Sequence, residues 1–150
     1  LHPGSNRRDV ARRSIELKAI YSWIEEQRSI SSERDYIILG DMNLEKAEEL
    51  QAVLSDTNFV SLNSSASSMT NTSRSNPKPY DHVFVDQTFT TEVQTENNFK
   101  IIDLVEMARE FWRPELGLFP GSPYIHNLFR LYYSDHHPVK FKLKCKKDDD

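Results

Sequence analysis

The chain of 150 residues has a single cysteine, Cys145, and only four glycines. One cysteine cannot form an internal disulfide, so nothing requires an oxidising compartment; the compartment stays open, and the cytoplasm is slightly favoured. No apolar run approaches the ~20 residues that a membrane-spanning helix needs. The sequence therefore predicts neither a disulfide scaffold nor a membrane span.

An excess of positive charge is also missing, since the formal net charge is -4. This argues against a protein that holds nucleic acid through a broad basic surface, because phosphate neutralisation supplies most non-specific affinity. An enzyme that binds phosphate through a metal ion stays compatible, because the cation supplies the charge. Hydrophobic residues make up 37% and charged residues 28%, which is typical of one globular domain.

Hydrophobic periodicity predicts alternating helices and strands. Apolar residues recur at helical spacing in 9–27 and again in 44–54. The almost wholly apolar run 36–39, which ends at Gly40, is typical of a strand buried on both faces.

The second half of the chain predicts shorter elements. Strands are expected at 82–85, with 89–93 as a candidate partner, at 100–102, and at 139–143, where apolar residues alternate. Asp103 is expected to cap a short helix that ends near Trp112. Two segments are expected to be irregular, a surface loop at 61–79 and a long ordered excursion at 113–128. The mixture indicates an α/β layered domain.

The first polar motif is Gly40-Asp41-Met42-Asn43, at the turn between a strand and a helix. A carboxylate can hold a hard cation or orient a water, and a neutral amide can bind a phosphoryl oxygen without repelling it. The competing interpretation is an aspartate that caps the next helix and an asparagine in a turn.

Two further motifs precede predicted strands: Pro79-Tyr80-Asp81-His82, and Ser134-Asp135-His136-His137-Pro138. The second places a carboxylate beside an imidazole, and its proline fixes the backbone that follows. His137 is interpreted as structural or exposed. Because all the motifs fall at strand ends, where such folds place ligands, we expect them to converge on one site.

The order and spacing of the three motifs resemble the endonuclease/exonuclease/phosphatase superfamily, to which pancreatic-type deoxyribonucleases belong. The resemblance implies that residues 1–145 form the C-terminal half of its domain, the second half of a four-layer α/β sandwich with a mixed β-sheet flanked by helices. Residues 146–150 are a charged tail. It also implies a missing N-terminal half, in the same chain or as a partner chain, which normally supplies a metal-binding glutamate.

The resemblance also implies roles for six residues. Asp41 and Asn43 match the pair that orients the attacking water, and Asp41 and Asp135 match positions near a Mg²⁺ or Mn²⁺ ion. His136 matches the histidine that contacts the phosphate, and Asp81 matches the acid that polarises it. His2 matches a histidine that acts as an acid or a phosphate ligand.

These roles predict a metal-dependent phosphoesterase, with a nuclease acting on DNA or RNA as the leading hypothesis. A phosphatase acting on an inositol polyphosphate or another small phosphoester comes second, and a non-catalytic binding module third. Loop 61–79 and the aromatic-rich segment 113–133 are expected to select the substrate. Their aromatic and basic side chains are interpreted mainly as packing and solvated residues: Trp112, Phe119, Tyr124, Phe129, Tyr132, Tyr133, Arg74, Lys78 and Arg130.

Overall fold

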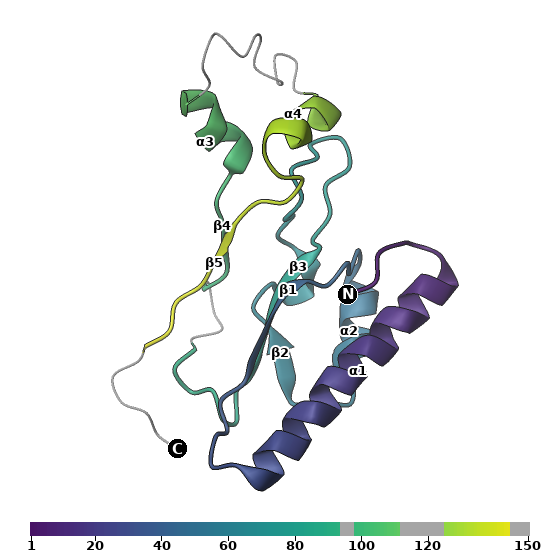
Figure 1. Cartoon of the computed structure of the whole chain (residues 1–150), viewed down its shortest axis with the longest axis vertical. Helices are drawn as coiled ribbons and strands as arrows, with labels where there is room; N and C mark the ends of the chain where they lie inside the picture. The colour runs from purple at the N-terminus through teal and green to yellow at the C-terminus, as the bar shows by residue number, and fades with distance from the viewer. Residues whose placement is uncertain (94–97, 112–124, 145–150) are drawn as a thin grey trace.

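The computed structural model describes residues 1–93, 98–111 and 125–144 (Figure 1). In these ranges the α-helices are α1 (Arg7–Ile30), α2 (Ala47–Leu54), α3 (Leu104–Phe111) and α4 (His126–Tyr132), and a short 3-10 helix, η1, spans Ser64–Ala66. The strands are β1 (Ile37–Asp41), β2 (Phe59–Ser61), β3 (Asp81–Asp86), β4 (Lys100–Ile101) and β5 (Val139–Lys140). The predicted α/β class is confirmed at this level.

The strands form two small antiparallel sheets. The larger has the order β1-β3-β2, and the register of its first pair places Asp41 opposite Asp81. The smaller pairs β4 with β5. Between the described strands every pairing in these sheets is antiparallel, so the parallel neighbours of a mixed sheet are not found in this part of the chain.

Helices α1 and α2 cover one face of the larger sheet (Figure 1). The core on this side joins residues of α1, α2 and the strands: Leu17, Tyr21, Ile24, Leu50, Val53, Phe59 and Phe84. At the start of α1, the side chain of Asn6 accepts hydrogen bonds from the N–H groups of Arg8 and Asp9, which satisfies two donors that the helix leaves open. Both predicted helices of the first half are confirmed, with α2 starting later than expected.

The other face of the larger sheet packs against the β4–β5 side of the molecule. Val83 and Val85 are buried there, with the partly buried Phe99 and Phe141 against them. Strand β1 lies at the edge of this sheet, and Leu39 is 61% exposed. The prediction that this strand is buried on both faces is therefore wrong, because no described element covers Leu39.

The strand predicted at 82–85 is confirmed as β3, but its proposed pairing with 89–93 is wrong. The chain turns after β3, where the N–H groups of Phe89 and Thr90 donate to the carbonyl of Asp86. Both neighbours of β3 come from earlier in the chain. Val93 instead makes an isolated bridge with Leu143.

Elements of the second half follow the prediction in part. Strands β4 and β5 lie within the predicted ranges, and Asp103 caps α3 by accepting from the N–H groups of Val105 and Glu106 at 3.0 and 3.1 Å. Of the excursion predicted at 113–128, residues 113–124 lie outside the described ranges, whereas 126–128 belong to α4. The predicted tail, 146–150, also lies outside them.

Loop 61–79 is not wholly a surface loop. Asn63, Thr70 and Thr72 are buried, with at most 1% exposed. Buried polar groups need hydrogen-bond partners, and these side chains have them within the loop, on β3 or on residues 126 and 134. As for membranes, none of the described helices has the length and apolar character needed to cross one.

Candidate functional site

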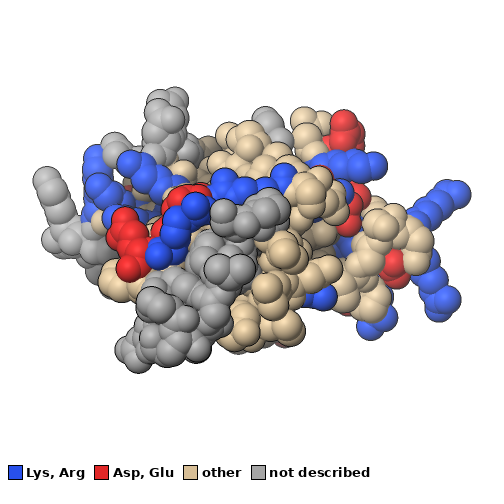
Figure 2. Space-filling view, turned by 90° about the horizontal axis from the view of Figure 1, so that it is seen from above, with Lys and Arg blue, Asp and Glu red and all other residues tan. Residues whose placement is uncertain are grey.

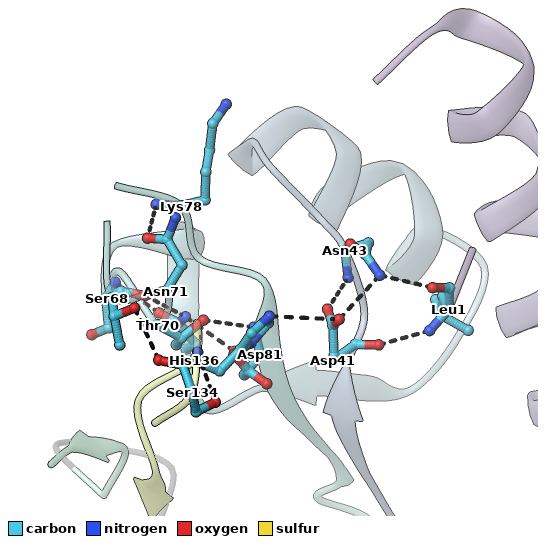
Figure 3. A network of polar contacts seen from close by, with 12 residues as sticks. Leu1, Asp41, Asn43, Ser68, Thr70, Asn71, Lys78, Asp81, Ser134 and His136 are labelled. Carbon is cyan, nitrogen blue, oxygen red and sulfur yellow. Dashed lines mark hydrogen bonds and ion pairs between the residues drawn. The ribbon is translucent and has the colours of Figure 1, made fainter. Parts of the chain in front are cut away.

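The three polar motifs meet at one end of the larger sheet (Figure 3). Because β1 and β3 run antiparallel, the end of β1 at Asp41 lies beside the start of β3 at Asp81. The third motif reaches this point through loop 61–79, where Asn71 and His136 form an isolated bridge. The predicted convergence of Asp41, Asp81 and His136 is thus present in the structure.

The imidazole of His136 lies between two carboxylates. Its Nδ1 is 2.7 Å from Oδ2 of Asp81, and its Nε2 is 3.8 Å from Oδ2 of Asp41. The hydrogen bond to Asp81 raises the pKa of His136 above its usual value, although partial burial acts against this, and the charges of Asp81, Asp41 and Asp135 raise it further. The charged imidazolium, which donates from both nitrogens, is therefore favoured.

Asp41 and Asn43 form a local turn that holds both side chains in place. The carboxylate of Asp41 accepts from the backbone N–H of Asn43 at 2.9 Å and from its amide at 3.2 Å. Asn43 has a φ of 51°, a left-handed conformation that asparagine tolerates better than most residues. The interpretation of Asp41 as a helix cap is wrong, because α2 begins only at Ala47 and has no side-chain cap.

The first residue of the chain contacts this turn. The backbone nitrogen of Leu1 donates to the carbonyl of Asp41 at 2.7 Å, and the carbonyl of Leu1 accepts from the side-chain amide of Asn43 at 2.8 Å. The backbone before His2 is therefore held next to the turn.

The side chain of His2 lies against the first helix. Its Nε2 is 3.5 Å from Oδ1 of Asp9, and its backbone N–H donates to Glu16 at 2.8 Å. That hydrogen bond is the main cause of the lowered pKa of Glu16. Of the six predicted site residues, His2 is thus next to Leu1, which contacts the site, but its own polar contacts are with α1.

Asp135 provides an exposed carboxylate next to His136. Its carbonyl accepts from the N–H of Thr72 at 2.7 Å. Asp41 and Asp135 offer the hard oxygen donors that Mg²⁺ and Mn²⁺ prefer. Within residues 1–93, 98–111 and 125–144, however, no three His, Cys, Asp or Glu side chains are grouped so that they could hold a metal ion. The donor chemistry fits the ion, but the described ligand set is too small to hold it.

Two residues without a predicted role lie in the site. Tyr80 places its ring 5.8 Å from the imidazole of His136, between ring centres, and burial raises the pKa of its hydroxyl. Thr70 hydrogen-bonds to the backbone on both sides of the Asp81–His136 pair. Tyr80 belongs to a motif that was recognised in the sequence, whereas nothing in the sequence distinguished Thr70 from the other polar residues of its loop.

His137 has a structural role, as interpreted from the sequence. Its Nδ1 accepts a hydrogen bond at 3.0 Å from the N–H of Leu104, the first residue of α3. Burial lowers its pKa, so the neutral ring that can accept this bond is favoured.

Several of the side chains that were considered for substrate selection are ion-paired or packed within the fold. Arg74 pairs with Asp103 and Glu106, and Lys78 pairs with Glu45 at 2.6 Å. Phe129 is fully buried in the core, which confirms its interpretation as a packing residue. Trp112, Phe119 and Tyr124 lie outside the described residues.

Comparisons with known proteins leave the function to be argued from the site. No protein-family model matches the chain, and a search of curated proteins found no match. The family resemblance therefore remains a prediction from the motifs.

Proposed function

We propose that this chain carries part of the reaction centre of a metal-dependent phosphoesterase, and that the enzyme is a nuclease that hydrolyses phosphodiester bonds in DNA or RNA. The observation that supports this most is the placement of His136 between Asp81 and Asp41, at 2.7 and 3.8 Å. These residues are 40 to 95 positions apart in the sequence, so their meeting depends on the fold and not on local structure. An imidazole whose pKa is raised, next to a partly exposed carboxylate, suits the handling of a phosphate group and of a water.

Each side chain has a distinct task in this proposal. Asp81 holds the Nδ1–H of His136, so that the Nε2–H donates to a phosphate oxygen and stabilises the charge that develops there. Asp41, which is fixed by Asn43, accepts a hydrogen bond from the attacking water and orients it for in-line displacement. The water transfers one proton to the carboxylate of Asp41 as its oxygen bonds to phosphorus. The bond to the leaving oxygen breaks, and that oxygen takes up a proton from solvent. No covalent enzyme intermediate is involved.

The proposed metal is Mg²⁺ or Mn²⁺, with Asp41 and Asp135 among its ligands. Such an ion, when bound, would neutralise phosphate oxygens and stabilise the leaving oxygen. Its remaining ligands would come from the other half of the domain, in the same polypeptide or in a partner chain. The two halves together would form the four-layer sandwich of the family that the motifs resemble.

A polymeric substrate is favoured by two exposed arginines in the first turn of α1, Arg7 and Arg8. Positive charge in the first turn of a helix opposes the helix dipole and costs stability, so a role outside the fold is a reasonable explanation. Seen from above, Lys and Arg side chains project at the right-hand edge of the molecule, the side on which α1 begins (Figures 1 and 2). This edge would contact backbone phosphates beyond the one that is cleaved.

Plasmid nicking by the full-length protein tests this function. Supercoiled plasmid is incubated with Mg²⁺, with and without a chelator, and Asp41→Ala is compared with Asp56→Ala. Asp56 is an exposed residue away from the site and serves as the matched control. We expect nicking that the chelator and Asp41→Ala abolish and Asp56→Ala retains.

Three other outcomes would contradict the proposed activity or the proposed role of Asp41. Release of phosphate from an inositol polyphosphate, with intact plasmid, would indicate the phosphatase. Absence of both activities, with no Mg²⁺-dependent thermal shift, would indicate a binding module. Full nicking by Asp41→Ala would remove Asp41 from the mechanism.

A further inference from the structure

Two buried threonines connect the segment that carries Asp81 to the segment that carries His136. Thr70 and Thr72 belong to the loop between η1 and β3, and their exposed fractions are 0% and 1%. Figure 3 shows Thr70 and Asn71 next to both Asp81 and His136. A polar residue that is buried this completely is retained where its hydrogen bonds are made, so the partners of these threonines indicate what they do.

On the β3 side, Thr70 fixes the backbone at Asp81. Its hydroxyl accepts a hydrogen bond from the N–H of Asp81 at 2.8 Å, and its own N–H donates to the carbonyl of Lys78 at 2.8 Å. Asp81 is the first residue of β3, and its carboxylate binds the imidazole. The position of that carboxylate therefore depends on the hydroxyl of Thr70.

On the other side, the same loop holds both neighbours of His136. The carbonyl of Thr70 accepts from the N–H of His137 at 2.6 Å, and the N–H of Thr72 donates to the carbonyl of Asp135 at 2.7 Å. The hydroxyl of Thr72 is also within 3.2 Å of the carbonyl of Ser134. The backbone of His136 is thus held from before and after.

We propose that Thr70 is a positioning residue: through its hydroxyl and its carbonyl it sets the separation of the Asp81 carboxylate and the His136 imidazole. Its effect on turnover rests on the proposed function, but its effect on the pair does not. Displacing a reacting group by about 1 Å can slow an enzyme on the order of 100-fold. One buried residue that binds the backbone of Asp81 through its hydroxyl and the backbone of His137 through its carbonyl is suited to prevent such a displacement.

The test compares Thr70→Val, which keeps the shape but removes the acceptor, with Thr70→Ser, which keeps the hydroxyl. In full-length protein with ¹⁵N-labelled histidine, NMR detects the proton on Nδ1 of His136, assigned by its loss in His136→Asn. We expect this proton to resonate downfield and exchange slowly in the native protein and in Thr70→Ser. In Thr70→Val we expect it to shift upfield or vanish through faster exchange, while kcat falls at least 10-fold and KM changes less.

Thr57→Val is the matched control, because the hydroxyl of Thr57 also accepts a backbone N–H, that of Phe59 at 3.3 Å, but far from the site. It should leave the His136 signal unchanged. If Thr70→Val does not fold, Thr70→Ala removes the same acceptor without adding bulk and should give the same loss.

Two results would overturn the proposal: an unchanged His136 proton in a folded variant without the hydroxyl, or an equal loss in Thr70→Ser. An altered signal in a protein without phosphoesterase activity would refute the proposed function and leave the positioning role intact. The two failures are therefore distinguishable.

Discussion

Nδ1 of His136 lies 2.7 Å from Oδ2 of Asp81, a residue 55 positions earlier in the chain. This is a charge-assisted hydrogen bond, and it fixes both the orientation of the ring and the nitrogen that carries the proton on that side. The opposite nitrogen, Nε2, lies 3.8 Å from Oδ2 of Asp41. The candidate site depends on this pair more than on any single residue.

Replacing Asp81 with Asn should lower the pKa of His136, because the hydrogen bond to Asp81 is the largest of the effects that raise this pKa. The pKa of His136 is higher in the folded protein than its unfolded value of about 6.5, so the pair makes its full contribution to stability below about pH 6.5. This contribution is lost as the pH rises through the folded pKa. The stability difference between native protein and Asp81→Asn should therefore shrink as the pH increases past that range.

Titration of the His136 ring by NMR, together with denaturation at several pH values, measures both effects. Asp135→Asn is a suitable comparison, because the charge of Asp135 is the smallest of the causes that raise the pKa. A His136 pKa that is the same in native protein and in Asp81→Asn would contradict this prediction.

His82 should make the fold sensitive to acid. It is fully buried against Phe84, and burial lowers its pKa to about 4. The pKa of His82 is lower in the folded protein than its unfolded value of about 6.5, so its stabilising effect is fully present above about pH 6.5. The effect is lost as the pH falls toward 4, and the free energy of unfolding falls by about 3 kcal/mol in total. Denaturant unfolding between pH 7 and pH 4 should therefore show a decreasing free energy of unfolding.

The double variant His82→Phe with Ser61→Ala isolates this effect. The hydroxyl of Ser61 is 2.9 Å from Nδ1 of His82, so both partners of one hydrogen bond are replaced together, which can be nearly neutral. The variant should retain its stability at neutral pH and lose less of it on acidification. An equal loss in native protein and in the variant would rule out His82 as the cause.

Removing one partner of the Arg28–Asp86 pair should destabilise the fold strongly. The two side chains are 2.9 Å apart and almost fully buried, and the guanidinium also lies over the ring of Phe89. A buried charge left without its partner typically costs about 3–5 kcal/mol. Asp86→Asn should lower the free energy of unfolding in urea denaturation by the lower end of this range, because Arg28 keeps an ion pair with the partly exposed Glu25 at 2.7 Å.

The ion pair of Arg74 with Asp103 is the matched control, since both side chains are about half exposed. Exposed pairs contribute roughly 0–1 kcal/mol, so Arg74→Met should have little effect. Similar losses from Asp86→Asn and Arg74→Met would show that burial is not what determines the importance of the Arg28 pair.

The sequence predicted those features that depend on local pattern. The periodicity of 9–27 identified α1, and Asp103 identified the start of α3, because a helix face and a cap are properties of neighbouring residues. The meeting of Asp41, Asp81 and His136 was predicted from the position of each motif at a strand end. The order of the motifs along the chain, which resembles that of a known superfamily, suggested their roles.

Features that depend on distant pairing could not be predicted in the same way. The placement of β3 between β1 and β2 is set by contacts across the fold, so its pairing with 89–93 was a reasonable but wrong inference from proximity in sequence. Leu39 looked like a core residue because the apolar run does not reveal which strand lies at an edge. Thr70 was missed because its burial and its two partners arise only when the loop folds against β3.

A double-mutant cycle in phosphodiester hydrolysis tests the central claim most directly, with rates of plasmid nicking measured for native protein, Asp81→Asn, His136→Asn and the double variant. If the two residues act as one unit, the double variant should be no slower than His136→Asn within a few-fold, as for other coupled catalytic groups. Two losses that multiply, or a native rate in His136→Asn, would contradict the account.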